Sequence, residues 1–272
     1  MSAPTRRRIV LVAIDASPES LAAVEMAARF AASLNAELRG MFVEDIDLLR
    51  AAELPFASVV SFGTATPLDL SSIERELRRR EAAAQRATAM AGDRLQVEWS
   101  FHVVRGAVVR EILKAAAEAE LTIAGRAGWT VRKSVRLGTV SRSLLEQSPS
   151  SVFLAERSAS EGPLAVLYDG SPASRRALEF AAALVRERTG LLFVLFDGVN
   201  PDETRHEAEA LLAGFGVSAR YRFLAGRSPG ALAESLLKVG ARTVIAPASP
   251  DTAELNLAAL AERLSCSFLL VR

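Results

Sequence analysis

The sequence predicts two tandem α/β units, each built on a five-stranded parallel sheet with helices on both faces. The chain has 272 residues, 50% of them hydrophobic, which is enough for two domains of ordinary size with a core each. One stretch of sequence occurs twice. Short apolar runs also alternate with longer segments at helical spacing, the pattern of parallel strands joined by crossover helices.

The internal repeat is clearest at residues 9–24, IVLVAIDASPESLAAV, which align with residues 163–178, PLAVLYDGSPASRRAL. Farther along, the segment after Gly106 resembles the segment after Gly226, and the first copy is the longer one. Similarity in the same order along the whole chain indicates duplication of one unit of normal domain size.

The repeat divides the chain into two domains. We expect the first at residues 1–158, a seam at Ser158–Gly162, and the second at residues 163–272. The first domain carries an insertion at about residues 45–70, which is apolar but interrupted by proline and glycine. Long connections of this kind are usually functional or disordered, so we interpret the insertion as a lid or a dimer contact.

Five apolar runs of the first unit are predicted strands. They are residues 9–14, 38–43, 97–104, 121–125 and 151–155. Apolar stripes at helical spacing run from Leu21 to Leu34 and from Val109 to Ala116. The second unit repeats the strands as LAVLY, LLFVLF, ARYRFL, TVIA and SFLLV.

The sequence indicates where three helices begin. Ser17 and Ser171 are predicted N-caps, each followed by a proline at the first helical position, where a missing N–H is no loss. A further helix is expected over residues 71–91, with Ser71 and Glu74 at capping-box spacing. Its Glu–Arg pairs, four residues apart, indicate a solvated face.

Composition excludes several classes of protein. With 33 basic and 32 acidic residues the net charge is +1, so we expect no nucleic-acid partner. No apolar run suits a membrane span or a signal peptide, so we expect a cytoplasmic protein with no membrane partner. The single cysteine, Cys266, rules out an internal disulfide and is expected to be a buried core residue. Two histidines, His102 and His206, leave little for a zinc site.

The fourth predicted strand is followed by GRAGWTVRKSVRLGTVSRS, in which Gly125, Gly128 and Gly138 precede Thr139. Ligands of open α/β sheets bind beyond the carboxyl ends of the strands, where glycine lets backbone N–H groups approach phosphates. Residues 121–145 contain five basic residues and no acid, which favours an anion. The same charges are also typical of a solvated loop or of a contact with a protein partner.

The DxS turn at Asp15–Ser17, the G-x2-G-x9-G-[S/T] loop and the small apolar last strand resemble the universal stress protein family, in tandem form. The resemblance implies a Rossmann-like fold of the adenine nucleotide alpha hydrolase type, with the two units packed as a pseudo-dimer. It implies ATP or another adenine nucleotide as the ligand, with or without Mg²⁺. The binding residues it implies are Ala13, Ile14, Asp15, Ser17, Val43, Ala124, Gly125, Arg126, Gly128, Gly138, Thr139 and Val140.

The resemblance also implies roles for these residues. Asp15 would lie near the ribose or a phosphate-bound magnesium ion, and Val43 would offer its backbone to adenine. The simpler interpretation of Asp15 is a turn residue ahead of a helix.

In the glycine loop, Gly125 and Gly128 would cradle phosphates together with the N–H groups of residues 138–140. The guanidinium of Arg126 would pair with a phosphate. Trp129 would stack on a base or cover the edge of the core.

The second unit keeps the turn of Asp169, Gly170 and Ser171 but has no glycine from Ala241 to the C-terminus. Prolines remove donors there and acidic residues repel phosphate. We therefore predict no comparable nucleotide site in the second unit, which is expected to stabilise the pseudo-dimer.

We expect a stress-response or regulatory protein whose ATP occupancy alters its conformation or its binding to a protein partner or to a second copy of itself. The alternative is a tandem scaffold of the same fold that binds no nucleotide. An enzyme is disfavoured, because the sequence has neither an SGGxDS pyrophosphate loop nor a GxxxxGK[ST] P-loop, and no cluster of His, Cys or Lys. We assign no catalytic residue and expect at most slow ATP hydrolysis.

Overall fold

The computed structural model describes residues 7–54, 58–61, 64–67, 69–128, 137–156, 162–186, 191–196, 201–224, 228–248 and 256–272. The first half contributes the strands β1 (Ile9–Ala13), β2 (Glu37–Asp45), β5 (Trp99–Gly106), β6 (Leu121–Gly125) and β7 (Ser151–Ala155). The second half contributes the strands β8 (Leu164–Tyr168), β9 (Leu192–Phe196), β10 (Ala219–Phe223), β11 (Thr243–Pro247) and β12 (Ser267–Val271).

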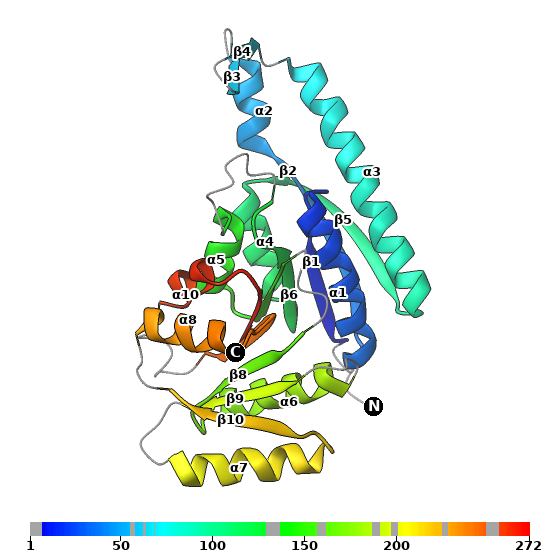
Figure 1. The fold of residues 1–272 in the computed structure, drawn as a ribbon. Helices are drawn as coiled ribbons and strands as arrows, with labels where there is room; N and C mark the ends of the chain where they lie inside the picture. Colours follow the sequence, from blue (N-terminus) through cyan, green and yellow to red (C-terminus); the bar gives the residue numbers. More distant parts are fainter. Residues whose placement is uncertain are drawn as a thin grey trace.

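These strands form one ten-stranded sheet in the order β10-β9-β8-β11-β12-β7-β6-β1-β2-β5 (Figure 1). Each half follows the same order outward from its first strand, and the two halves meet at their last strands. Every pair within a half is parallel, whereas β7 and β12 are antiparallel. The predicted α/β fold with parallel five-stranded halves is confirmed, and the halves share one continuous sheet.

Helices follow the strands in both halves. In the first half they are α1 (Pro18–Leu34), α2 (Ile46–Glu53), α3 (Leu70–Leu95), α4 (Val108–Ala116) and α5 (Thr139–Gln147). In the second half they are α6 (Pro172–Arg186), α7 (Pro201–Gly214), α8 (Pro229–Lys238) and α10 (Leu257–Arg263). No helix in the described part of the chain is long and apolar enough to cross a membrane.

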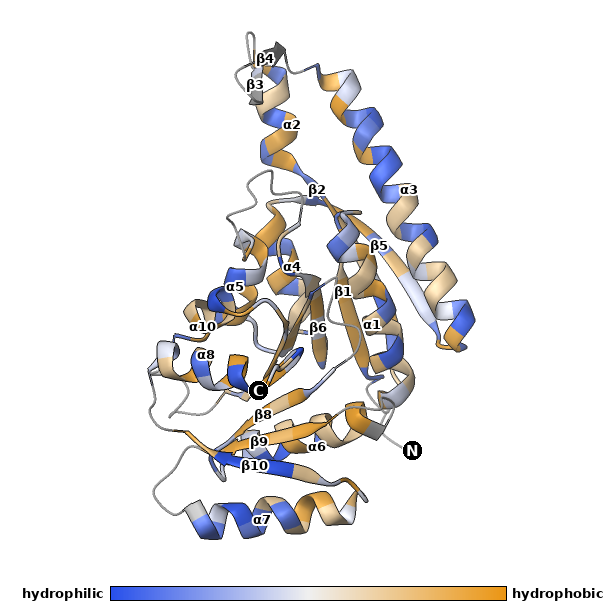
Figure 2. Cartoon of the chain, viewed as in Figure 1, coloured by the Kyte–Doolittle hydropathy of each residue, from blue (hydrophilic) through white to orange (hydrophobic). Residues whose placement is uncertain are grey.

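The core has two layers, one on each face of the sheet. Along β1, Val10 and Val12 join the cluster under α1, while Leu11 and Ala13 join the cluster on the opposite face, because successive side chains of a strand point to opposite faces. Figure 2 shows the central strands as largely apolar and the outer helices as mixed. The first layer is continuous across the two halves, because the ring of Phe30 packs against Phe153 at 5.4 Å and against Phe180 of α6 at 6.4 Å between centroids.

Two of the predicted helix caps are confirmed and one is wrong. The hydroxyl oxygens of Ser17 and Ser171 accept hydrogen bonds from the N–H groups three residues later, at 3.2 and 3.1 Å. Helix α3, in contrast, is capped by Asp69, whose Oδ2 accepts from the Ser72 N–H at 3.0 Å, while Ser71 donates its hydroxyl to the same carboxylate at 2.7 Å. The carboxylate accepts several donors at once, so it outcompetes the Ser71 hydroxyl for the cap.

The insertion forms a projecting arm. It consists of α2 and an antiparallel hairpin of β3 (Ser58–Ser61) and β4 (Thr64–Pro67). The arm extends beyond the carboxyl ends of the strands, beside the first turns of α3 (Figure 1). Along α3, the Glu76–Arg80 ion pair at 2.9 Å and the Glu74–Arg78 pair at 3.7 Å confirm the predicted Glu–Arg pairs four residues apart.

Candidate functional site

A cavity of about 370 Å³ opens at the carboxyl ends of β1, β2 and β6, and its size is typical of ligand pockets, which span about 300–1,000 Å³. Helices α1, α4 and α5 flank it, and side chains of α3 contribute to its outer wall. The chain runs from β1 to β2 on one side, while β6 lies on the other side of β1. The cavity thus lies where the strand order reverses, the usual position for a ligand in an open α/β sheet.

All the predicted binding residues except Arg126 line this cavity. From the β1 turn and β2 come Ala13, Ile14, Asp15, Ser17 and Val43. From β6, the glycine loop and α5 come Ala124, Gly125, Gly128, Gly138, Thr139 and Val140. Segments more than a hundred residues apart in the sequence are therefore brought to one crevice by the strand order.

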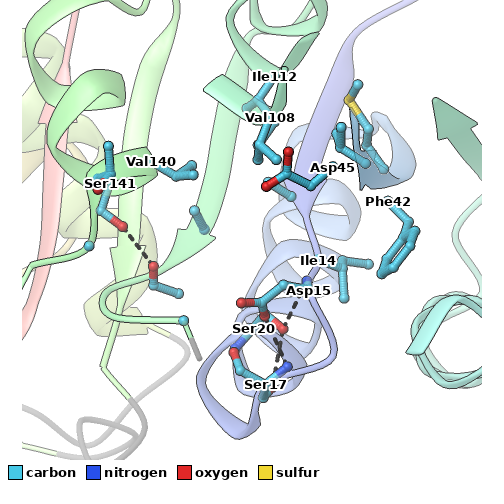
Figure 3. A pocket seen from close by; sticks show the side chains of 18 of the residues that line it. Ile14, Asp15, Ser17, Ser20, Phe42, Asp45, Val108, Ile112, Val140 and Ser141 are labelled. Carbon is cyan, nitrogen blue, oxygen red and sulfur yellow. Dashed lines mark hydrogen bonds between the residues drawn. The ribbon is translucent and has the colours of Figure 1, made fainter. Parts of the chain in front are cut away.

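Asp15 holds the turn after β1 and also faces the cavity (Figure 3). Its Oδ1 accepts a hydrogen bond from the Ser17 N–H at 2.9 Å, and its own N–H donates to the Ser20 hydroxyl at 3.3 Å. Ala16 adopts a left-handed conformation with a φ of 60° to make this turn. Asp15 thus has the turn role that the sequence offered as the simpler interpretation, and its carboxylate also borders the cavity.

Val43 lies where β2 continues past the end of β1. The last pair between the two strands is Ala13 with Met41, whereas β2 pairs with β5 as far as Asp45. The Ile14 N–H donates to the Met41 carbonyl at 2.9 Å, so the backbone groups of Met41 face β1. Residues two apart in a strand direct their backbone groups to the same side. Val43 therefore presents its N–H and C=O to the space beyond β1.

The glycines of the loop serve different purposes. A side chain on Gly125 would meet the backbone of Glu19 and Ser20 at 2.9 Å, so this glycine lets α1 pack closely against β6. Gly128 has a φ of +56°, and a Cβ there would lie 2.8 Å from Oδ2 of Asp15. Only the second glycine leaves open the space in front of the Asp15 carboxylate.

The first turn of α5 lines the cavity. Gly138 is its N-cap and provides no side-chain cap, so the amides of Thr139 and Val140 have no intrahelical acceptor. The Gly138 N–H, however, donates to the Arg126 carbonyl at 2.7 Å. The expectation that this N–H meets a phosphate is corrected, because it closes the loop instead.

Arg126 is a second correction. Its side chain is only 2% exposed and points away from the cavity into the second half. The guanidinium donates to the carbonyls of Ala261, Leu264 and Cys266 at 2.6–2.9 Å. An arginine held in this way is not available to a phosphate at the cavity. Trp129 and the basic residues Arg132, Lys133 and Arg136 lie outside the described residues.

The sequence did not single out several residues of the cavity. Met41, Val108 and Ile112 form an apolar wall. The carboxylate of Asp45 lies near Val108 (Figure 3). Asp45 Oδ1 also caps α2, accepting from the Asp47 N–H at 3.0 Å. Its position at the end of a predicted strand was a signal in the sequence, but Asp45 was assigned to the insertion.

Leu77 and Arg80 of α3 also line the cavity. The Arg80 Nε lies 2.9 Å from Oε1 of Glu76, so this cation reaches the crevice as part of an ion pair. Helical periodicity indicated a solvated face here, and nothing in the sequence pointed to the sheet edge. Leu48 of α2 completes this side of the wall. The first part of the insertion is therefore adjacent to the cavity, and its role as a lid or dimer contact stays a prediction.

The second half keeps the turn that follows its first strand, but different residues surround it. Asp169 Oδ1 accepts from the Ser171 N–H at 2.9 Å, and Gly170 takes a φ of +80°. Oε2 of Glu207, on α7, lies 3.8 Å from the position of a Gly170 Cβ. Burial and this carboxylate raise the pKa of Tyr168 to about 12. Oε1 of Glu207 also pairs with Nε of Arg175 at 2.5 Å, so an ion pair borders this turn. The absence of a comparable nucleotide site in the second half stays a prediction.

The residues that the structure describes contain no group of three or more His, Cys, Asp or Glu side chains able to hold a metal ion. Cys266 is buried as expected, and burial raises the pKa of its thiol to about 11.

The fold and the crevice define an open α/β protein with a ligand-sized cavity at its switch point. Residues 6–155 match the universal stress protein family, more than half of the chain, and the chain belongs to that family.

Two solved structures that cover nearly the whole chain agree with this fold. A universal stress protein from Archaeoglobus fulgidus DSM 4304 superposes with a TM-score of 0.68 at 19% identity, covering 97% of this chain and 96% of that chain. A functionally unknown protein from Pseudomonas aeruginosa PAO1 gives 0.60 at 14% identity, covering 97% and 92%. A universal stress protein from Lactobacillus plantarum gives 0.42 at 19% identity, covering 56% of this chain and 99% of its own. No curated protein matches the sequence significantly.

Proposed function

We propose that the first half binds an adenine nucleotide, with ATP as the main ligand, and that occupancy of this site regulates the conformation or the partners of the protein in a stress response. The observation that carries the proposal is the cavity at the switch point. It combines an apolar wall, an exposed strand backbone and the uncapped N-terminus of α5 in one crevice.

The cavity offers suitable chemistry at each end. The backbone groups of Val43, beside the apolar side chains of Met41 and Ile112, suit the edge and faces of a purine. The amides of Thr139 and Val140, at the positive end of the α5 dipole, suit a phosphate. The Asp15 carboxylate, between these regions, suits hydroxyl groups of a ribose or a Mg²⁺ ion carried by the phosphates.

A scaffold that binds no nucleotide is the alternative. The continuous core and the shared sheet would support it equally well. What favours the nucleotide is Gly128, because a left-handed glycine that keeps space free beside a carboxylate has no evident packing role.

Titration calorimetry with ATP tests the proposal on the full chain. We expect the wild type to bind and Gly128→Val to lose binding, because the new side chain fills the space in front of Asp15. Gly170→Val is the matched control. It places the same strain at a positive φ in the second half and should leave the affinity unchanged. Absence of binding to the wild type would favour the scaffold. Equal loss in both variants would show that the loss does not depend on the first-half cavity.

A further inference from the structure

We propose that Arg126 couples the first-half site to the second half of the molecule. Arg126 holds the glycine loop against the α10 end, which is the segment from Leu264 to Cys266 that follows α10. Binding of a ligand in the cavity and closure of the α10 end are therefore energetically coupled. Arg126 is then a positioning residue, which touches no ligand. The inference rests on the proposed function for the identity of the ligand but not for the coupling itself.

The backbone of Arg126 organises the site loop. Its N–H donates to the Ala155 carbonyl at 3.2 Å, and its carbonyl accepts from the Gly138 N–H at 2.7 Å. The first bond ties the start of the loop to β7, and the second ties it to the N-cap of α5. A shift of Arg126 would therefore move both the Gly128 side and the α5 side of the cavity.

The side chain of Arg126 organises the second half. Nη2 donates to the carbonyls of Ala261 and Leu264 at 2.6 and 2.9 Å, and Nη1 donates to the Cys266 carbonyl at 2.8 Å. The Ala261 carbonyl also accepts from the Leu264 N–H at 3.3 Å. The last carbonyls of a helix lie at its negative end, so a cation is favoured there. A planar guanidinium satisfies several carbonyls at once, which an ammonium cannot do with the same geometry.

Burial makes this link stiff. The Arg126 side chain is 2% exposed, and its one described carboxylate neighbour is Glu156, with Nε 3.4 Å from Oε2. A buried charge that loses its partners is costly, so the loop and the α10 end move together. No residue of α10 lines the cavity, and any response of α10 to a ligand must therefore travel through intervening residues.

Arg142 provides a matched control. It lies on α5 and also reaches across the halves, forming an ion pair with Glu262 of α10. Its side chain is 44% exposed, however, and exposed ion pairs contribute little. If any charged contact between the halves sufficed, Arg126 and Arg142 would behave alike.

The only cysteine of the chain reports on the α10 end. Cys266 is 2% exposed, so a thiol reagent reacts only when the segment from Leu264 to Cys266 opens, and the labelling rate measures that opening. Arg126→Lys keeps the positive charge near the thiol but loses the planar fork. We expect at least tenfold faster labelling in Arg126→Lys and a rate close to wild type in Arg142→Met.

Coupling in the opposite direction is tested without any ligand. Gly128→Val distorts the loop two residues from Arg126, so we expect faster Cys266 labelling, whereas Gly170→Val in the second half should change it less. Equal effects of these two variants, or equal effects of Arg126→Lys and Arg142→Met, would overturn the inference.

The effect of ATP on the rate of Cys266 labelling is the decisive test. We expect saturating ATP to slow Cys266 labelling several-fold in the wild type and in Arg142→Met, but not in Arg126→Lys, which should also bind ATP at least fivefold more weakly. ATP binding by calorimetry with unchanged labelling would overturn the coupling and leave the proposed function standing. Absence of binding would overturn the proposed function, and the ligand-free variants would then decide the coupling alone.

Discussion

At the scale of single residues, the two halves form the same turn after their first strands with different residues. The first half places Ala16 at a φ of 60°, and the second places Gly170 at a φ of +80°. A left-handed conformation costs a residue with a Cβ about 1–2 kcal/mol, whereas glycine adopts it freely. The β1 turn therefore stores strain beside the cavity.

This difference gives a prediction for stability. Ala16→Gly should raise the free energy of unfolding by up to about 1 kcal/mol, because relief of strain exceeds the added chain entropy. Gly170→Ala should lower it by about 1 kcal/mol or more. Urea unfolding followed by circular dichroism measures both. A destabilised Ala16→Gly would show that the turn is not strained.

The residue scale also shows the limit of sequence reasoning. The cavity residues at strand ends were predictable, because a parallel sheet aligns the carboxyl ends of its strands. Arg126 was assigned to a phosphate because it lies between two glycines, but the sequence does not reveal that α10 ends beside it. The direction of a side chain between two packed units depends on a contact 140 residues away in the sequence.

At the scale of elements, the start of α3 depends on protonation. Hydrogen bonds from Ser72 and then from Ser71 to Asp69 lower the pKa of its carboxyl from 3.8 to about 2. A depressed pKa in the folded state means that the cap stabilises α3 above pH 3.8 and is lost as the pH falls toward 2.

We therefore expect the first turn of α3 to fray between pH 4 and pH 2, seen as faster amide exchange in residues 70–75. Asp69→Asn, which keeps an acceptor but does not titrate, should show no such step. Ser71→Ala should weaken the helix less than Asp69→Ala, since Ser71 is not the cap. If Ser71→Ala frays α3 as much as Asp69→Ala, the assignment of the cap is wrong.

Boundaries of elements were predictable for a related reason. The first-half strands begin and end within two residues of the apolar runs. The central strands β1, β6 and β7 are buried on both faces, and such a strand is apolar along its whole length. The projecting arm was not predictable, since α2 and the β3–β4 hairpin have no repeat partner and no strong pattern. Asp45 and Leu48, the two cavity residues that belong to the predicted insertion, were therefore not predicted as site residues.

At the scale of the whole molecule, the halves share a sheet and both layers of the core. β7 and β12 pair antiparallel, with Phe153 opposite Leu269, and the Arg126 contacts lie close to this joint. Two units joined by so much buried surface should unfold together. This contrasts with domains connected only by a linker, which open separately.

The chain offers separate probes for its halves, because both tryptophans, Trp99 and Trp129, precede the joint and both tyrosines, Tyr168 and Tyr221, follow it. We predict that tryptophan fluorescence and tyrosine near-ultraviolet dichroism show coincident transitions in urea. Arg126→Lys should move the two transitions apart, as the second half loses its link to the first. Separate transitions in the wild type would contradict the joint core.

The most direct measurement of the central claim is a map of amide chemical shifts in the labelled full chain on addition of ATP. The account predicts the largest changes at Val43, Gly128, Thr139 and Val140, smaller changes at the α10 end, and none around Gly170. Saturating shifts confined to the second half, or no shifts at those four amides, would contradict it.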